Sequence, residues 1–103
     1  MAVIEIPISS NGAHFEQENE VFTKTFIFEF EWVERESTWL LHIFDDSHNP
    51  LALGLKLQPM WPIYSHHIGF RTIKFMLVAT KPCQSLCRNN LKDNFILVAR
   101  EAV

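Results

Sequence analysis

The sequence is poor in the residues that mark flexible or cross-linked chains. Its 103 residues include only 3 glycines, 5 prolines and 2 cysteines. So few glycines and prolines exclude a collagen-like repeat and a linker composition, and two cysteines do not make a disulfide framework. Apolar residues make up 48% of the chain, with nine phenylalanines and three tryptophans. This composition is typical of a folded, aromatic-rich protein, and the length predicts one domain covering residues 1–103.

Long apolar runs and basic clusters are also missing. No apolar stretch approaches the roughly 20 residues that span a bilayer. The first residues, "MAVIEIPISSNG", carry Glu5 where a signal peptide would be basic. Lysine and arginine are scattered singly, and the formal net charge is −3. We therefore expect synthesis in the cytoplasm, no membrane contact and no nucleic-acid contact.

The usual signatures of catalysis are absent from the sequence. With glycine only at positions 12, 54 and 69, a glycine-rich phosphate loop is excluded. No serine lies in a Gly-x-Ser-x-Gly elbow, and nothing singles out a pair of carboxylates for acid–base work. We expect no catalytic residue, no cofactor and no enzymatic activity.

What the chain does have is alternation with a period of two. In "TFIFEFEWVE", residues 25–34, Phe26, Phe28 and Phe30 share one face, which predicts a strand because a helix would scatter these rings. "TWLLHIFD", residues 38–45, is apolar on both faces, as in a strand covered on both sides. "VIEIPI" (3–8), "LALGLKL" (51–57), "RTIKFMLVAT" (71–80) and "FILVARE" (95–101) are also predicted strands.

About six strands without a convincing helix predict an all-β fold, a small antiparallel barrel or sandwich. The residues 58–70, "QPMWPIYSHHIGF", hold no period and are predicted to be a connection. The segment 81–94, "KPCQSLCRNNLKDN", is predicted to be a polar loop with at most a short helical turn. The expected core residues are Phe26, Phe28, Phe30, Trp39, Leu41, Ile43, Leu53, Leu55, Phe75, Leu77, Phe95 and Leu97.

Two groups of residues have the chemistry of metal ligands. The first group is His42 with Asp45, Asp46 and His48 of "DDSHNP", a segment that lacks the glycine and the spaced oxygen ligands of a calcium loop. Asp, Ser and Asn commonly bond their own backbone, so we interpret this segment as a hairpin turn and predict no metal site there.

The second group is Cys83 and Cys87 with His66 and His67. Adjacent histidines do not have the usual spacing of zinc ligands, so a zinc-binding domain is kept only as an alternative.

The connection 58–70 is rich in aromatic residues and is the best candidate for a contact surface. Trp61, Tyr64 and Phe70, with His66 and His67, are predicted to form an interface with a protein partner, because Trp and Tyr are enriched at such contacts. The same aromatics would alternatively fill one end of the fold. A third possibility is a platform for sugar in a carbohydrate-binding or receptor-binding module.

The order of several motifs resembles the cyanophage-type plug family, the small baseplate plug proteins of contractile-tailed phages. The resemblance covers roughly the first two-thirds of the chain, and "KPCQSLCRNNLKDNF" departs from the Gly- and Asp-rich turn of the family. The matching residues are Ile6-Pro7-Ile8, Trp39, Leu41, Ile43, Asp45, Pro50-Leu51, Gly54, Leu57 and Tyr64.

This resemblance implies a structural virion protein in the tail baseplate, made in the cytoplasm of a bacterial host. It implies contacts with the hub, the tail tube and neighbouring wedge or sheath subunits, in several copies related by symmetry. No catalytic residues come with the family. The tail-tip receptor-binding module and the zinc-binding domain remain the alternatives.

Overall fold

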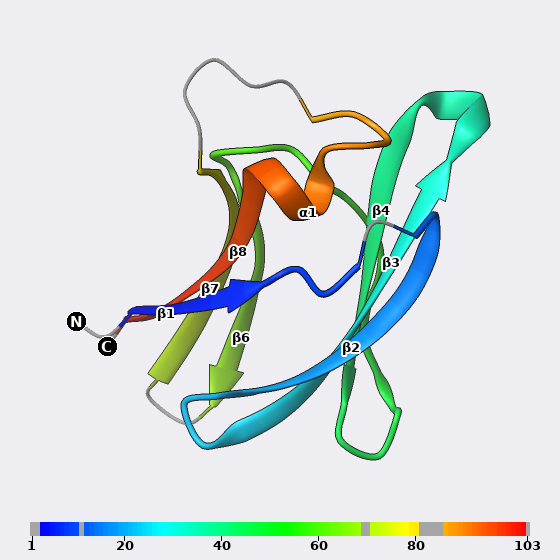
Figure 1. Cartoon of the computed structure of the whole chain (residues 1–103). Helices are drawn as coiled ribbons and strands as arrows, with labels where there is room; N and C mark the ends of the chain where they lie inside the picture. Colours follow the sequence, from blue (N-terminus) through cyan, green and yellow to red (C-terminus); the bar gives the residue numbers. More distant parts are fainter. Residues whose placement is uncertain (1–2, 11, 69–70, 81–85, 103) are drawn as a thin grey trace.

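The computed structural model describes residues 3–10, 12–68, 71–80 and 86–102, and within these ranges it is a β-sandwich (Figure 1). Two four-stranded antiparallel sheets pack together, which confirms the predicted all-β fold. The strands are β1 (Val3–Pro7), β2 (His14–Val21), β3 (Lys24–Val33), β4 (Thr38–Asp45), β5 (Pro50–Lys56), β6 (Pro62–Ile68), β7 (Arg71–Ala79) and β8 (Phe95–Ala102).

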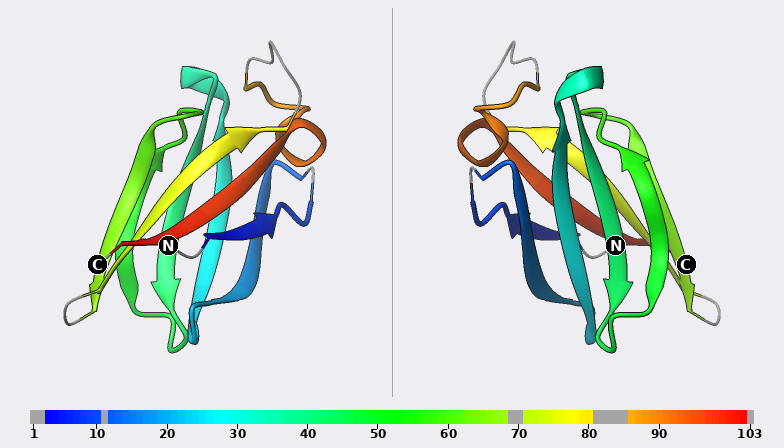
Figure 2. Two further views of the ribbon diagram at one scale, coloured as in Figure 1. Left: turned by 90° about the vertical axis from the view of Figure 1, so that its left-hand side faces the viewer. Right: turned by 90° about the vertical axis from the view of Figure 1, so that its right-hand side faces the viewer.

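We call the sheet with strand order β1-β8-β7-β6 the terminal sheet and the sheet with order β2-β3-β4-β5 the central sheet. Figure 2 shows that the strands of the two sheets cross at an angle. Two short helical segments complete the described part of the chain, a 3-10 turn at Glu34–Glu36 and α1 at Leu91–Asn94. Neither of these is long or apolar enough to cross a membrane.

Two of the eight strands in the described residues, β2 and β6, were not expected from the sequence. β2 reads "HFEQENEV", and its inward positions include Gln17 and Asn19, so the apolar alternation that marks a strand is weak. β6 follows Pro59 and begins at Pro62, and its register shifts between Pro62 and Tyr64. The predicted connection 58–70 is therefore wrong for residues 62–68, because proline and a bulge conceal the period.

The core lies between the two sheets and is built largely of aromatic rings. Phe26 and Phe28 of β3 meet Phe75 of β7 edge-to-face, with ring centroids 5.4 Å and 5.7 Å apart. Ten of the twelve expected core residues are fully buried, and Leu53 and Leu55 are the two exceptions. Buried apolar residues that were not predicted from the sequence to be in the core are Ile6, Ile8, Val21, Ile27, Leu57, Ile73, Leu91 and Ala99.

Leu53 and Leu55 depart from the prediction because β5 does not keep a strict alternation. Gly54 has a φ of +69°, and the pairing of β4 with β5 shifts register on either side of Ile43. Leu53 is consequently 60% exposed, while Leu55 is only partly buried at the margin of the core. The alternation is broken because Gly54 has a left-handed backbone conformation, which residues with a Cβ adopt only at a cost in free energy.

The segment "DDSHNP" is the turn of the β4–β5 hairpin, as predicted. The Asp45 carboxylate accepts hydrogen bonds from the backbone N–H groups of Ser47 (2.9 Å) and Asn49 (2.8 Å) and from the Asn49 side chain (3.2 Å). These bonds, the backbone bond from Asn49 first, lower the pKa of Asp45. The opening aspartate of the turn is thus used to fix the backbone.

Trp39 joins the central sheet to the loop that precedes α1. Its indole ring is fully buried, and its Nε1–H donates to the Cys87 carbonyl oxygen at 3.1 Å. The Arg88 guanidinium lies over the ring, 5.8 Å from its centroid. Trp39 therefore anchors the core, as predicted, and also holds a segment 48 residues away in the sequence.

Candidate interface

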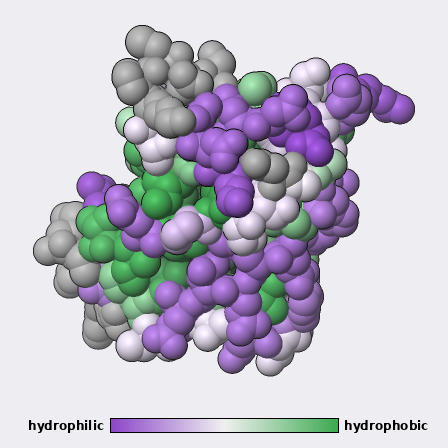
Figure 3. All heavy atoms as spheres, viewed as in Figure 1, coloured by the Kyte–Doolittle hydropathy of each residue, from purple (hydrophilic) through white to green (hydrophobic). Residues whose placement is uncertain are grey.

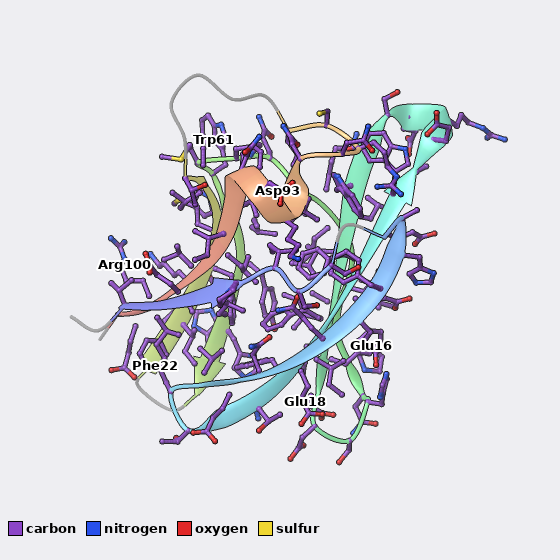
Figure 4. All side chains as sticks on the ribbon, in the orientation of Figure 1. Glu16, Glu18, Phe22, Trp61, Asp93 and Arg100 are labelled. Atoms are coloured by element: carbon purple, nitrogen blue, oxygen red, sulfur yellow. The ribbon has the colours of Figure 1, made fainter. Side chains whose placement is uncertain are left out.

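Four of the predicted contact residues, Trp61, Tyr64, His66 and His67, lie on β6 or just before it, at the edge of the terminal sheet. Trp61 precedes the strand and is 62% exposed, and its neighbour Met60 is 60% exposed. A backbone hydrogen bond from Met60 N to Leu77 O, 2.7 Å long, holds this segment against β7. The indole ring is therefore presented on an ordered backbone (Figure 4).

Tyr64 and His66 face the interior of the sandwich. The Tyr64 ring stacks on Phe75 at 6.1 Å, and the His66 ring meets the edge of Phe26 at 5.3 Å. Burial raises the pKa of Tyr64 and lowers the pKa of His66, and Lys24 and His67 lower the latter further. Neutral His66 can then accept a hydrogen bond at Nδ1 from the Tyr64 hydroxyl, whose oxygen lies 3.1 Å away.

His67 faces away from the core, and its Nδ1 lies 3.0 Å from Thr72 Oγ1 on the neighbouring strand. Phe70, the last of the predicted contact residues, lies outside the described residues. The predicted set is thus divided by the alternation of β6, with Trp61 and His67 outward and Tyr64 and His66 inward. One face of the Tyr64 ring is covered by Phe75, so that face is not available to stack on a sugar.

The outer face of the central sheet is acidic, a feature that was not predicted from the sequence. Glu16 and Glu18 project from β2 on this side of the molecule (Figure 4), and Glu29 and Glu31 stand beside them on β3. Alternating glutamates in "HFEQENEV" are the sequence signal that could have identified this face.

Three histidines of this face contact glutamates from other strands. His14 pairs with Glu29, and this hydrogen bond raises the pKa of His14. The other pairs, both with nitrogen–oxygen distances of 3.1 Å, are His42 with Glu31 and His48 with Glu16.

His42 has a second bond that fixes its tautomer. Its Nδ1 accepts the backbone N–H of Gly54 at 2.9 Å, so the ring proton lies on Nε2 and is donated to Glu31. Through these two bonds His42 links the left-handed glycine of β5 to β3.

Metal ligation has little support in the described residues. Among residues 3–10, 12–68, 71–80 and 86–102, no three His, Cys, Asp or Glu side chains are grouped so that they could hold a metal ion. Cys87 is a free, exposed thiol, and Cys83 of the suggested zinc quartet lies outside the described residues.

Comparison with known families decides what kind of protein carries these surfaces. The model of the family described as cyanophage baseplate Pam3 plug gp18 matches residues 3–102. The chain belongs to this baseplate plug family. The match extends over the last third of the chain, where the motifs alone departed from the family pattern. No curated protein and no solved structure gives a significant match.

Membership in the baseplate plug family establishes the general role of the chain. It is a structural component of a phage baseplate, located in the tail of the virion and associated with other baseplate proteins. A structural family also indicates a role that is not enzymatic.

Proposed function

We propose that this protein joins the hub, the tail tube and neighbouring wedge or sheath subunits of a contractile tail, in several copies related by symmetry. The observation that carries this proposal is the family match over residues 3–102, nearly the whole chain. The compact sandwich supports it, because its two outer sheet faces leave several surfaces for contacts with neighbours.

Within this role, the β6 margin is the proposed contact site. Trp61 and His67 touch the partner, while Tyr64 and His66 hold β6 against Phe75 and Phe26. An exposed tryptophan on an ordered backbone supports this assignment, because tryptophan contributes strongly where it is buried in an interface. Phe70, outside the described residues, remains a predicted member of the same surface.

The test is quantitative mass spectrometry of gradient-purified particles from cells that encode this protein. We expect a few copies per particle, in a multiple of three, and far fewer than the copies of the tube and sheath subunits. Absence of the protein from purified particles would contradict the proposed function. A copy number equal to that of the tube or sheath would contradict a place confined to the baseplate.

A further inference from the structure

The outer face of the terminal sheet has an ordered pattern that emerges only from the strand pairing. Ile6, Phe75, Leu77 and Leu97 point into the core, so the residues between them point outward. Across β1, β8, β7 and β6, the outward rows are Pro7–Ile96–Val78, then Glu5–Val98–Met76–Pro62, then Val3–Arg100–Lys74–Ser65.

The first two rows form an apolar belt in which Glu5, at the β1 end, is the exception. In Figure 3, hydrophobic side chains gather on the left of the view, around β1 and β8. The exposed side chains of Met60 and Trp61 lie at the β6 end, where Met60 is bonded to β7. This belt is therefore continuous with the proposed contact site.

Two cations, Lys74 and Arg100, lie in the third row, next to the apolar belt. Lys74 and Arg100 are directly opposite each other in the pairing of β7 with β8. Like charges at directly opposite positions of an antiparallel pair destabilise it. Among the residues that the structure describes, neither side chain has an ion-pair partner. The isolated molecule thus keeps an unfavourable charge pair beside an apolar surface.

A hollow of about 190 Å³ lies where the belt meets the two cations. It is lined by Pro62, Lys74, Phe75, Met76, Val98 and Arg100. An apolar side chain placed here would cover Met76 and Val98, and a carboxylate beside it would lie near both cations.

The area of this face indicates what kind of contact it makes. Four strands about 4.8 Å apart and three rows about 6.7 Å apart give a face of roughly 400 Å². A stable pair of proteins buries about 800 Å² on each partner. Two copies joined only through this face would therefore fall short, whereas a segment held by other contacts in a larger assembly would fit.

We propose that this face docks a segment of another baseplate protein, with an apolar side chain in the hollow and an Asp or Glu carboxylate between Lys74 and Arg100. The inference rests on the proposed function and gives the chemistry of the partner. The carboxylate relieves the repulsion between the two cations, which explains why this charge pair stands beside the apolar belt.

The first test removes the two charges. In particles assembled with Lys74→Gln and Arg100→Gln together, we expect at least about tenfold fewer copies of the protein, because two charge-assisted contacts are lost. The thermal midpoint of the purified variant should stay the same or rise, since repulsion is removed. Arg35→Gln with Lys56→Gln removes one arginine and one lysine elsewhere on the exposed surface and should incorporate normally.

The outcomes separate this inference from the proposed function. Wild-type levels of the Lys74/Arg100 variant in particles would overturn the docking of this face and leave the baseplate role intact. Equal losses in both double variants would also overturn it, because the effect would then reflect overall charge. Absence of the wild-type protein from particles would overturn the baseplate role, and this inference with it.

The second test identifies the partner's chemistry. A photo-crosslinking amino acid in place of Met76 should, within purified particles, attach to another baseplate protein at an apolar residue within a few positions of Asp or Glu. Attachment to a second copy of this chain, or to a segment without a nearby carboxylate, would overturn the proposal. The same amino acid in place of Leu53, which is exposed on the other sheet, is the matched control.

Discussion

Trp39 combines two functions that a smaller ring cannot both supply, a large apolar surface and an N–H group at its far edge. We expect Trp39→Phe to lower the free energy of unfolding by roughly 1–3 kcal/mol, because the Cys87 carbonyl loses its donor and the core loses packing. Denaturant unfolding measures this change. Trp61→Phe, at an exposed position, is the control, and an equal effect in both variants would contradict the anchoring role.

His66 gives the stability of the fold a dependence on pH. Its pKa is lowered by burial, so the unfolded chain takes up a proton more readily than the folded one. The contribution of His66 is constant above its unfolded pKa of about 6.5 and becomes unfavourable as the pH falls below that value.

This dependence is checked by comparing the wild type with His66→Gln. Between pH 7.5 and 5, the thermal midpoint of the wild type should fall more steeply than that of the variant. The raised pKa of His14 acts in the opposite direction in both proteins, so it cancels in the comparison. Parallel profiles of the two proteins would contradict the assignment.

At the scale of elements, the β4–β5 hairpin depends on one left-handed glycine. A Cβ added at Gly54 would meet no atom within 4 Å, so Gly54→Ala tests backbone conformation without a clash. With φ at +69°, we expect a loss of about 1–2 kcal/mol in the free energy of unfolding. Leu53→Ala, next to it and exposed, should stay within about 0.5 kcal/mol. Equal effects in the two variants would show that the left-handed backbone is not the cause.

The strands that could be predicted from the sequence are those in which apolar residues recur at every second position. In β3 and β7 the inward phenylalanines and Leu77 are buried, as the alternation predicts, and Ile27 on the opposite face of β3 is buried as well. β2 has a buried Gln17, which is satisfied by Ser9 N at 2.9 Å and Pro7 O at 3.0 Å, and no sequence pattern foretells such partners. The shift at Gly54 is equally hidden, because the leucines around it alternate perfectly.

The candidate site shows the same division. Trp61, predicted to belong to a contact surface, is exposed, whereas Tyr64 and His66 face inward because they lie on the unexpected strand β6. The Lys74–Arg100 pair could not be found from the sequence, because it depends on the register between two strands. The alternation within a strand predicts which face of the sheet a side chain lies on, whereas its neighbours on that face depend on how the strands pair.

At the scale of the whole molecule, the two outer faces differ in character, with glutamates and histidines on the central sheet and apolar residues with two cations on the terminal sheet. If the β6 margin is the contact site, Trp61→Ala should reduce the number of copies per particle several-fold without changing the thermal midpoint, because the exposed ring contributes little to the fold. Leu53→Ala is the matched control for loss of an exposed apolar side chain. Unchanged incorporation of Trp61→Ala would contradict the assignment of this margin.

The antiparallel pairing of β1 with β8 brings Val3 opposite Arg100, so the start of β1 and the end of β8 lie side by side, as Figure 1 shows. A short peptide linker could therefore close the backbone into a ring without disturbing either sheet. The ring would have fewer conformations when unfolded, which should raise the melting temperature. New ends could then be opened in the exposed turn after Asp45, giving a circular permutant of the same sandwich.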